Sequence, residues 1–175
     1  MTVFPFNGVW PTIADDVFIA PGAMIIGNVT IQEGASIWYN AVVRGDVAPI
    51  VIGRNTNIQD NCTLHVDADA PLTIGDNCTV GHGAVVHGAT VEQHVLIGMK
   101  AAVLSHARIG SNTIIGACAL VAEHKSIPEG VLAIGIPAKV ARPLTPAESE
   151  HIITSAVGYA QRGRLHKASI SSSHE

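Results

Sequence analysis

The feature that most constrains this chain is an aliphatic residue that returns every six positions. The spacing is regular from Ile19 to Val43, returns in two short blocks, and then runs without error from Val91 to Ile127. Four positions after these anchors the side chains are mostly small. A period of six fits neither a helix, with 3.6 residues per turn, nor a strand that simply alternates its two faces.

A chain with this period makes a short strand and then a corner, over and over. Three such sides form one triangular coil of about 18 residues, and neighbouring coils pair as parallel strands about 4.8 Å apart. The anchors and the small residues point into a narrow core that each coil buries against the next. Glycine after many anchors and Asn or Asp near the corners suit turns with unusual backbone angles. The sequence therefore predicts an all-β fold, a parallel β-helix.

The repeat divides the chain into three parts. Residues 1–143 are expected to form the β-helix domain, residues 144–167 a C-terminal α-helix that packs on it, and residues 168–175 a flexible tail. Thr145 and Glu148 frame the helix start as a capping box around Pro146. The apolar side of the helix is expected to face the β-helix through four residues: Ile152, Ile153, Ala156 and Ala160.

Composition narrows the class of partner. Only 14% of the 175 residues are charged and the net charge is −4, so nucleic acid is not an expected partner. No long apolar run or basic leader is present, which predicts no membrane association and a cytoplasmic location. Three cysteines in no CxxC pattern are expected to be small buried thiols: Cys62, Cys78 and Cys118.

Three of the nine histidines stand out by their place in the repeat. His65 and His87 each follow an anchor, and the 22 residues between them are one coil plus a four-residue insertion. They are therefore expected to stack on adjacent coils about 5 Å apart, close enough to share one metal ion. His82 lies around a corner, roughly 15 Å away by strand rise, and cannot reach the same ion within one chain.

A threefold homotrimer resolves this separation. A neighbouring chain can bring its own His82 against His65 and His87, which gives three interface sites per trimer. Three histidines with an open fourth position are the ligand set of catalytic zinc, whereas structural zinc sites close all four positions. The pattern thus predicts a metal site with a bound water.

Other motifs carry a family resemblance over nearly the whole chain. Arg44-Gly45-Asp46, the run from Asn57 to Asn61, His65 and the run from Gly81 to Gly88 are similar to the gamma-class carbonic anhydrases. That resemblance implies a left-handed β-helix of hexapeptide repeats. The left hand comes from the resemblance alone, since ordinary parallel crossovers are right-handed. It also implies that His65, His82 and His87 bind Zn²⁺, or alternatively Fe²⁺ or Co²⁺, at trimer interfaces.

The implied function is that of a lyase, the reversible hydration of carbon dioxide to bicarbonate by a metal-bound hydroxide at the trimer interface. Gln59 would orient the metal-bound solvent, and Asn57 is a weaker candidate for the same role. Tyr159 resembles a tyrosine that relatives place near the metal pocket, and it could equally be a packing residue. The resemblance also implies that Arg44, Asp46 and Asp60 belong to an ion network that the family conserves at its subunit interfaces.

The chain departs from the family prototypes where they place glutamates for proton transfer. Val47 follows Asp46, and the loop of residues 66–71 is short, with two aspartates only. Asp67 or Asp69 could relay protons, although an exposed aspartate usually only solvates a turn.

Other functions stay open at this point. The chain could be an acyl-coenzyme A thioesterase, a hexapeptide acyltransferase, or a non-catalytic trimeric module locked by its metal. The remaining histidines share no slot with the three ligands and are expected on the surface: His94, His106, His124, His151, His166 and His174.

Overall fold

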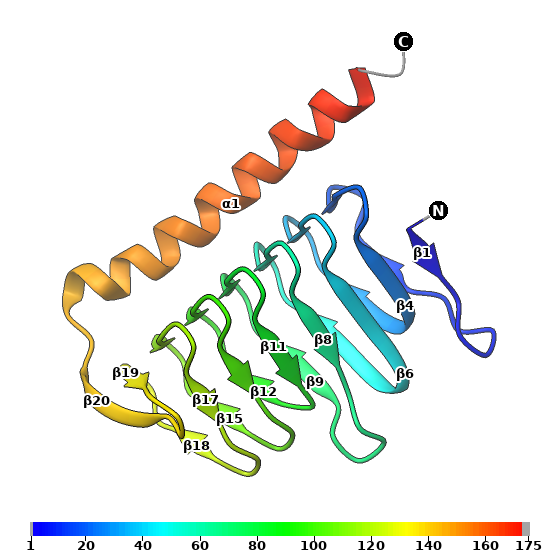
Figure 1. The fold of residues 1–175 in the computed structure, drawn as a ribbon. Helices are drawn as coiled ribbons and strands as arrows, with labels where there is room; N and C mark the ends of the chain where they lie inside the picture. Colours follow the sequence, from blue (N-terminus) through cyan, green and yellow to red (C-terminus); the bar gives the residue numbers. More distant parts are fainter. Residues whose placement is uncertain (1, 173–175) are drawn as a thin grey trace.

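The computed structural model describes residues 2–172, which form a three-sided parallel β-helix with one long helix beside it (Figure 1). Two walls belong to one twelve-stranded sheet, because β4 (Met24–Ile31) and β6 (Val42–Ile52) bend across the edge between them. The first wall adds β1 (Val3–Phe4), β8 (Thr63–His65), β11 (Val85–His87), β14 (Ala102–Val103) and β17 (Leu120–Val121). The second adds β2 (Thr12–Ile13), β9 (Leu72–Ile74), β12 (Thr90–Val91), β15 (Arg108–Ile109) and β18 (Ser126–Ile127).

The third wall is an eight-stranded sheet that closes the prism. Its strands are β3 (Phe18–Ile19), β5 (Ser36–Ile37), β7 (Asn57–Ile58), β10 (Thr79–Val80), β13 (Val95–Ile97), β16 (Thr113–Ile115), β19 (Val131–Ile134) and β20 (Lys139–Pro143). All pairings are parallel except that of β19 with β20, which is antiparallel. The predicted succession of short strands and corners is thus confirmed.

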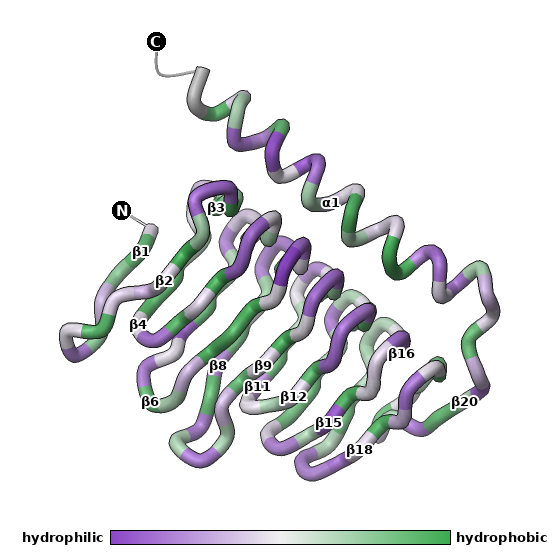
Figure 2. Tube along the Cα trace, turned by 180° about the vertical axis from the view of Figure 1, so that it is seen from behind, coloured by the Kyte–Doolittle hydropathy of each residue, from purple (hydrophilic) through white to green (hydrophobic). Residues whose placement is uncertain are grey.

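The six-residue period is the period of the core. From Ile25 to Ile127 every anchor is at most 2% exposed, and only the first, Ile19, is partly open at the end of the prism. The small residues four positions later are buried with them, Ala84 and Ala107 for example at 0%. Figure 2 shows the consequence: hydrophobic stretches follow the strands, and hydrophilic ones gather at the corners.

The corners use two different devices. Asn40, Asn55, Asn77 and Asn112 have φ between 52° and 59°, the left-handed conformation that Asn tolerates well. The glycines after the anchors, however, do not have positive φ, so the predicted reason for them is wrong. At Gly98 a Cβ would lie 2.5 Å from the nitrogen of Ala117 on the next coil, so glycine is needed there for close approach of two backbones.

Helix α1 (Pro146–Ser172) runs back along the third wall (Figure 1). The capping box is confirmed, since the nitrogen of Glu148 donates to Thr145 Oγ1 at 3.3 Å and Glu148 Oε2 accepts from the Thr145 nitrogen at 2.9 Å. Arg142 adds an ion pair to Glu148 at 2.7 Å and lowers the pKa of that carboxyl to about 2. Ile152 is buried as expected, but Ile153 is 41% exposed, so it is not part of the packed face.

The end of α1 differs from the expected boundary at residue 167. The helix continues through Ser172, and residues 173–175 of the expected tail lie outside the described part of the chain. Two contacts explain the extension. Lys167 Nζ donates to the carbonyl of Val17 at 3.2 Å, and Ile170 packs against the cluster of Phe18 and Trp38. These contacts stabilise a last turn that its own sequence does not predict.

Two of the three cysteines are buried thiols, as predicted. Burial raises the pKa of Cys62 to about 11 and that of Cys78 to about 12. Cys118 is exposed at a corner, so that part of the prediction is wrong. Among residues 2–172 no helix is long and apolar enough to cross a membrane, and the expected cytoplasmic location stays a prediction.

Candidate metal centre

His65 and His87 lie side by side on the first wall, in register on strands β8 and β11. The neighbouring residues Leu64 and Val86 point into the core at 0% exposure, so the alternation of the strand turns both histidines outward. Their ring centroids are 4.9 Å apart, and His65 Nδ1 lies 2.9 Å from His87 Nε2. The predicted stacking on adjacent coils is confirmed.

Asp46 holds the other nitrogen of His65. Its Oδ1 lies 2.9 Å from His65 Nε2, and its Oδ2 pairs with Arg44. Burial raises the pKa of Asp46, but the hydrogen bonds from His65 and Arg44 outweigh burial and lower it. Because an ionised carboxylate can only accept, His65 donates from Nε2 and turns Nδ1 toward His87.

His87 is held in the same way, but through a hydroxyl. Its Nδ1 lies 2.9 Å from Ser105 Oγ, and that hydroxyl donates to Asp67 Oδ2 at 2.6 Å. The hydrogen bond from Ser105 lowers the pKa of Asp67, with burial opposing and the charges of the nearby histidines assisting. The two nitrogens that face each other, His65 Nδ1 and His87 Nε2, are the ones left for a metal ion, which binds histidine through a lone pair.

His82 stands at the corner between β10 and β11, with its side chain 46% exposed. Its Nδ1 lies 2.8 Å from Asp60 Oδ2, on the same corner of the preceding coil. All three predicted ligands therefore have one nitrogen tied to a carboxylate, directly or through Ser105, and keep the other for a metal. This is the usual arrangement of histidine ligands in metal sites.

Gln59 and Tyr159 open into the same cavity as His82. The cavity has a volume of ≈ 390 Å³, lies between α1 and the third wall, and is lined mostly by apolar side chains such as Met99. Gln59 Nε2 donates to Asn57 Oδ1 at 3.1 Å. Asn57 itself is 0% exposed and donates to Thr79 Oγ1, so it acts on the cavity only by fixing the amide of Gln59.

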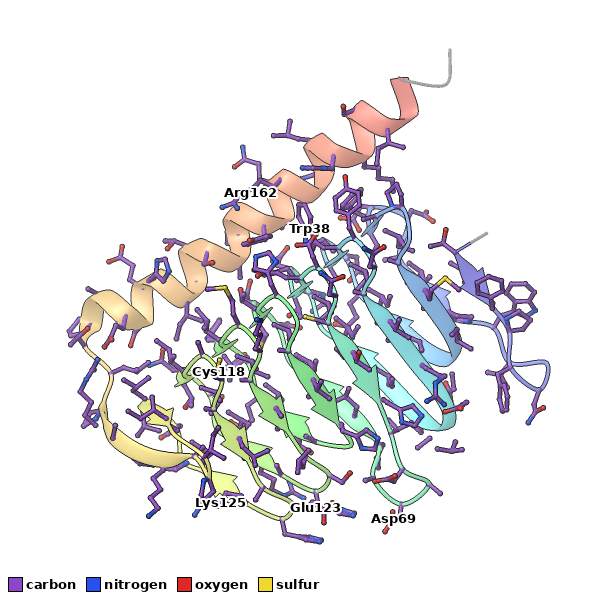
Figure 3. All side chains as sticks on the ribbon, in the orientation of Figure 1. Trp38, Asp69, Cys118, Glu123, Lys125 and Arg162 are labelled. Carbon is purple, nitrogen blue, oxygen red and sulfur yellow. The ribbon has the colours of Figure 1, made fainter. Side chains whose placement is uncertain are left out.

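Tyr159 is also a packing residue. Its ring and that of Trp38 make an edge-to-face contact, with centroids 5.4 Å apart, and Arg162 Cζ lies over the Tyr159 ring, 4.4 Å from its centroid. Figure 3 shows Trp38 between the wall and α1, where this contact anchors the helix. Tyr159 therefore lines the cavity and packs the helix at once, which joins the two interpretations that the sequence left open.

Within one chain the predicted ligands fall into two separate groups. His65 and His87 face outward from the first wall with Asp46, whereas His82 and Gln59 share the cavity beside α1. Throughout residues 2–172, no group of three His, Cys, Asp or Glu is arranged to hold a metal ion. A three-histidine site therefore needs two chains.

Sequence reasoning missed Ser105, and it placed one histidine wrongly. Ser105 shares no repeat slot with His87, so periodicity gives no signal for it. His166 is half-buried rather than free on the surface, because it packs on Trp38 with centroids 5.0 Å apart. His124 is exposed, as predicted, and its ring stacks on that of His106, which lies 18 residues earlier on the adjacent coil, with centroids 4.6 Å apart.

Known proteins with similar sequences decide the family. The family described as "Bacterial transferase hexapeptide (six repeats)" matches residues 11–45 and 88–123. A carbonic anhydrase from Geobacillus kaustophilus is 45% identical over 166 residues, which are 95% of this chain and 91% of that protein. Mitochondrial gamma carbonic anhydrase 2 of Arabidopsis thaliana is 43% identical over 171 residues. The chain belongs to the gamma carbonic anhydrase family.

Membership of the gamma carbonic anhydrases confirms the left-handed β-helix of hexapeptide repeats that the resemblance implied. The chain spans 62% of the length of the Arabidopsis protein. A solved structure from Bacillus cereus, described as that of a proposed acetyltransferase, is also similar, with a TM-score of 0.94 and 40% identity. The match covers 95% of this chain and 97% of that one. The proteins similar to this chain therefore include gamma carbonic anhydrases and one structure described as that of an acetyltransferase.

Proposed function

We propose that this protein is a metal-dependent lyase that hydrates carbon dioxide reversibly at the interfaces of a homotrimer. His65 and His87 of one chain and His82 of its neighbour would hold the metal. The observation that carries this proposal is the 2.9 Å approach of His65 Nδ1 and His87 Nε2, with the outer nitrogen of each ring engaged by other groups. Such a pair of rings is aimed at a common point.

The donor set fits a zinc or ferrous ion. Two nitrogens bound to one tetrahedral zinc lie about 3.3 Å apart, since each Zn–N bond is about 2.0 to 2.1 Å. The observed pair needs to open by only a few tenths of an ångström. A metal here would supply an acidic bound water, with a pKa near 7 rather than 15.7, as a nucleophile at neutral pH. Zn²⁺, Fe²⁺ and Co²⁺ all accept imidazole ligands.

The other predicted residues have roles that follow from their contacts. Gln59 would orient the reacting water through Oε1, because its Nε2 is already given to Asn57. Asp46 and Asp60 would fix the tautomers of His65 and His82, and with Arg44 they would form the ion network of the trimer interface. Val47, next to Asp46, supplies no proton acceptor, so proton removal would depend on water in the cavity.

Subunit mixing tests the proposed geometry. His82→Ala and His65→Ala should each abolish metal binding and hydration, measured by metal analysis and stopped-flow with Zn²⁺ or Fe²⁺. In a 1:1 mixture after subunit exchange, about one quarter of the interfaces pair an intact His65 with an intact His82. About one quarter of the metal and activity should therefore return.

The matched control mixes His65→Ala with His87→Ala. Because these two ligands come from the same chain, no interface in that mixture is complete and nothing should return. Equal recovery in both mixtures, or none in the first despite verified exchange, would refute the inter-subunit site.

A second candidate is chemistry on an acyl group, as a thioesterase or an acyltransferase. The cavity of ≈ 390 Å³ beside His82 is far larger than carbon dioxide requires, and the Bacillus cereus structure is described by an acetyltransferase activity. Turnover of short-chain acyl-coenzyme A by the metal-loaded trimer, with no hydration of carbon dioxide, would favour this alternative. Absence of both activities with metal retained would favour a non-catalytic module.

A further inference from the structure

Ser105 is a buried hydroxyl placed against the outer edge of the proposed metal pair. It follows strand β14 on the coil next to His87 and is 5% exposed. Its Oγ lies 2.9 Å from His87 Nδ1. A Cβ at Gly88 would meet Ala70 first, at 2.7 Å, and the Ser105 oxygen at 3.1 Å, so the hydroxyl lies in a closely packed corner.

The direction of these hydrogen bonds follows from Asp67. The carboxylate can only accept, and at 2.6 Å it takes the single proton of the Ser105 hydroxyl. Ser105 must then accept from His87, which places the ring proton on Nδ1 and leaves the lone pair on Nε2. Nε2 is the nitrogen that faces His65. Asp67 alone stands 3.6 Å from His87 Nδ1, too far for a good hydrogen bond.

We propose that Ser105 and Asp67 are positioning residues that fix His87 in the tautomer and orientation required for metal binding. This inference rests on the proposed function. It assigns Asp67 a holding role instead of the proton relay considered from the sequence. It also assigns a reason for the loop of residues 66–71, which brings a carboxylate over the ring of a histidine from the next coil.

Asp69, on the same loop, makes no comparable contact with its own neighbouring histidine. Its carboxylate is 82% exposed and approaches His106 Nε2 only at 3.6 Å, without an intervening hydroxyl. Figure 3 shows Asp69 at the tip of the loop, pointing away from the β-helix. The holding contact is specific to Asp67, Ser105 and His87.

The test compares Ser105→Ala with two other variants of the trimer. Ser105→Ala should weaken Zn²⁺ and Co²⁺ binding about 10- to 100-fold in chelator competition. Ser105→Thr, which keeps the hydroxyl, should stay within about threefold of the wild type. Ser111→Ala is the matched control, because Ser111 also donates to a carboxylate, Glu92 at 2.7 Å, but contacts no ligand histidine. It should change nothing, and thermal melting checks that all variants are folded.

A second readout does not depend on metal. Nitrogen-15 NMR of the metal-free protein should show the ring proton of His87 on Nδ1, and in Ser105→Ala it should shift toward Nε2. Metal affinity and tautomer both unchanged in Ser105→Ala, while His87→Ala loses the metal, would overturn the positioning role and leave the proposed function standing. If the wild type binds no metal, the proposed function fails, and the tautomer measurement alone decides the inference.

Discussion

Two pairs of histidines lie on adjacent coils, and they differ in what surrounds them. His65 and His87 meet at 65°, with their facing nitrogens 2.9 Å apart. His106 and His124 stack at 3°, with centroids 4.6 Å apart. The lone pairs of imidazole lie in the ring plane, so the lone pairs of two parallel rings lie in parallel planes that do not meet. Only the first pair can converge on one ion.

The difference comes from the partners rather than from the coil. Coil spacing alone brings equivalent side chains into contact, and it does so for both pairs. Asp46 and Ser105 then rotate His65 and His87 toward each other. His106 and His124 instead occupy corners with φ of 63° and 59°, where no second hydrogen bond of this kind turns the rings. These outer contacts are what would let two histidines on adjacent coils act together as metal ligands.

The largest expected effect comes from removing one histidine from each pair in turn. His87→Ala should lose the bound metal and lower hydration by at least about 10³-fold, because the proposed reaction depends on the metal. His124→Ala should keep one metal per chain and hydration within twofold of the wild type. Metal analysis and stopped-flow hydration check both. Loss of metal in the His124→Ala variant would show that stacking, without the outer contacts, is enough for binding.

The sequence predicted the fold because every coil must bury its anchor against the next. A break in the six-residue spacing would expose an aliphatic side chain, so the period records the core directly. The same argument placed His65 beside His87, since a slot in the repeat is also a place in the structure. Family resemblance then supplied the roles of Gln59 and Arg44, which no spacing shows.

The remaining features depend on contacts between residues that the repeat does not relate. Ser105 reaches Asp67 across 38 residues through a loop whose path is not periodic. The last turn of α1 follows from packing against Phe18 and Trp38, which local helix propensity does not record. Corner glycines such as Gly98 are needed for the approach of the next coil, which becomes visible only when two coils are placed together.

A smaller effect on stability should distinguish His106 and His124, which lie at corners, from His65 and His87, which lie on strands, because only the corner residues have positive φ. His124 has positive φ, which a β-branched side chain adopts only at a cost, so His124→Val should lower the free energy of unfolding by about 1 to 2 kcal/mol. His124→Asn is the control and should be nearly neutral, because asparagine occupies the equivalent conformation at Asn112 and other corners. Urea unfolding of the metal-free protein measures both. Equal destabilisation would mean that the imidazole stack, not the backbone, stabilises this corner.

The smallest expected effect lies on α1, away from both histidine pairs. The pKa of Glu148 is lowered to about 2 by Arg142 and Thr145, from an ordinary value of 4.5. A lowered pKa means that the ionised carboxylate stabilises the folded state above about pH 4.5, and that this contribution disappears as the pH falls through about 2. Glu148→Gln should therefore be less stable than the wild type at pH 7, and the difference should shrink steadily between these two values. Urea midpoints followed by tryptophan fluorescence in a Trp10→Phe background, which leaves Trp38 under the helix as the single tryptophan, measure this at constant ionic strength. A difference independent of pH would show that the cap acts through hydrogen-bond geometry and not through the charge of Glu148.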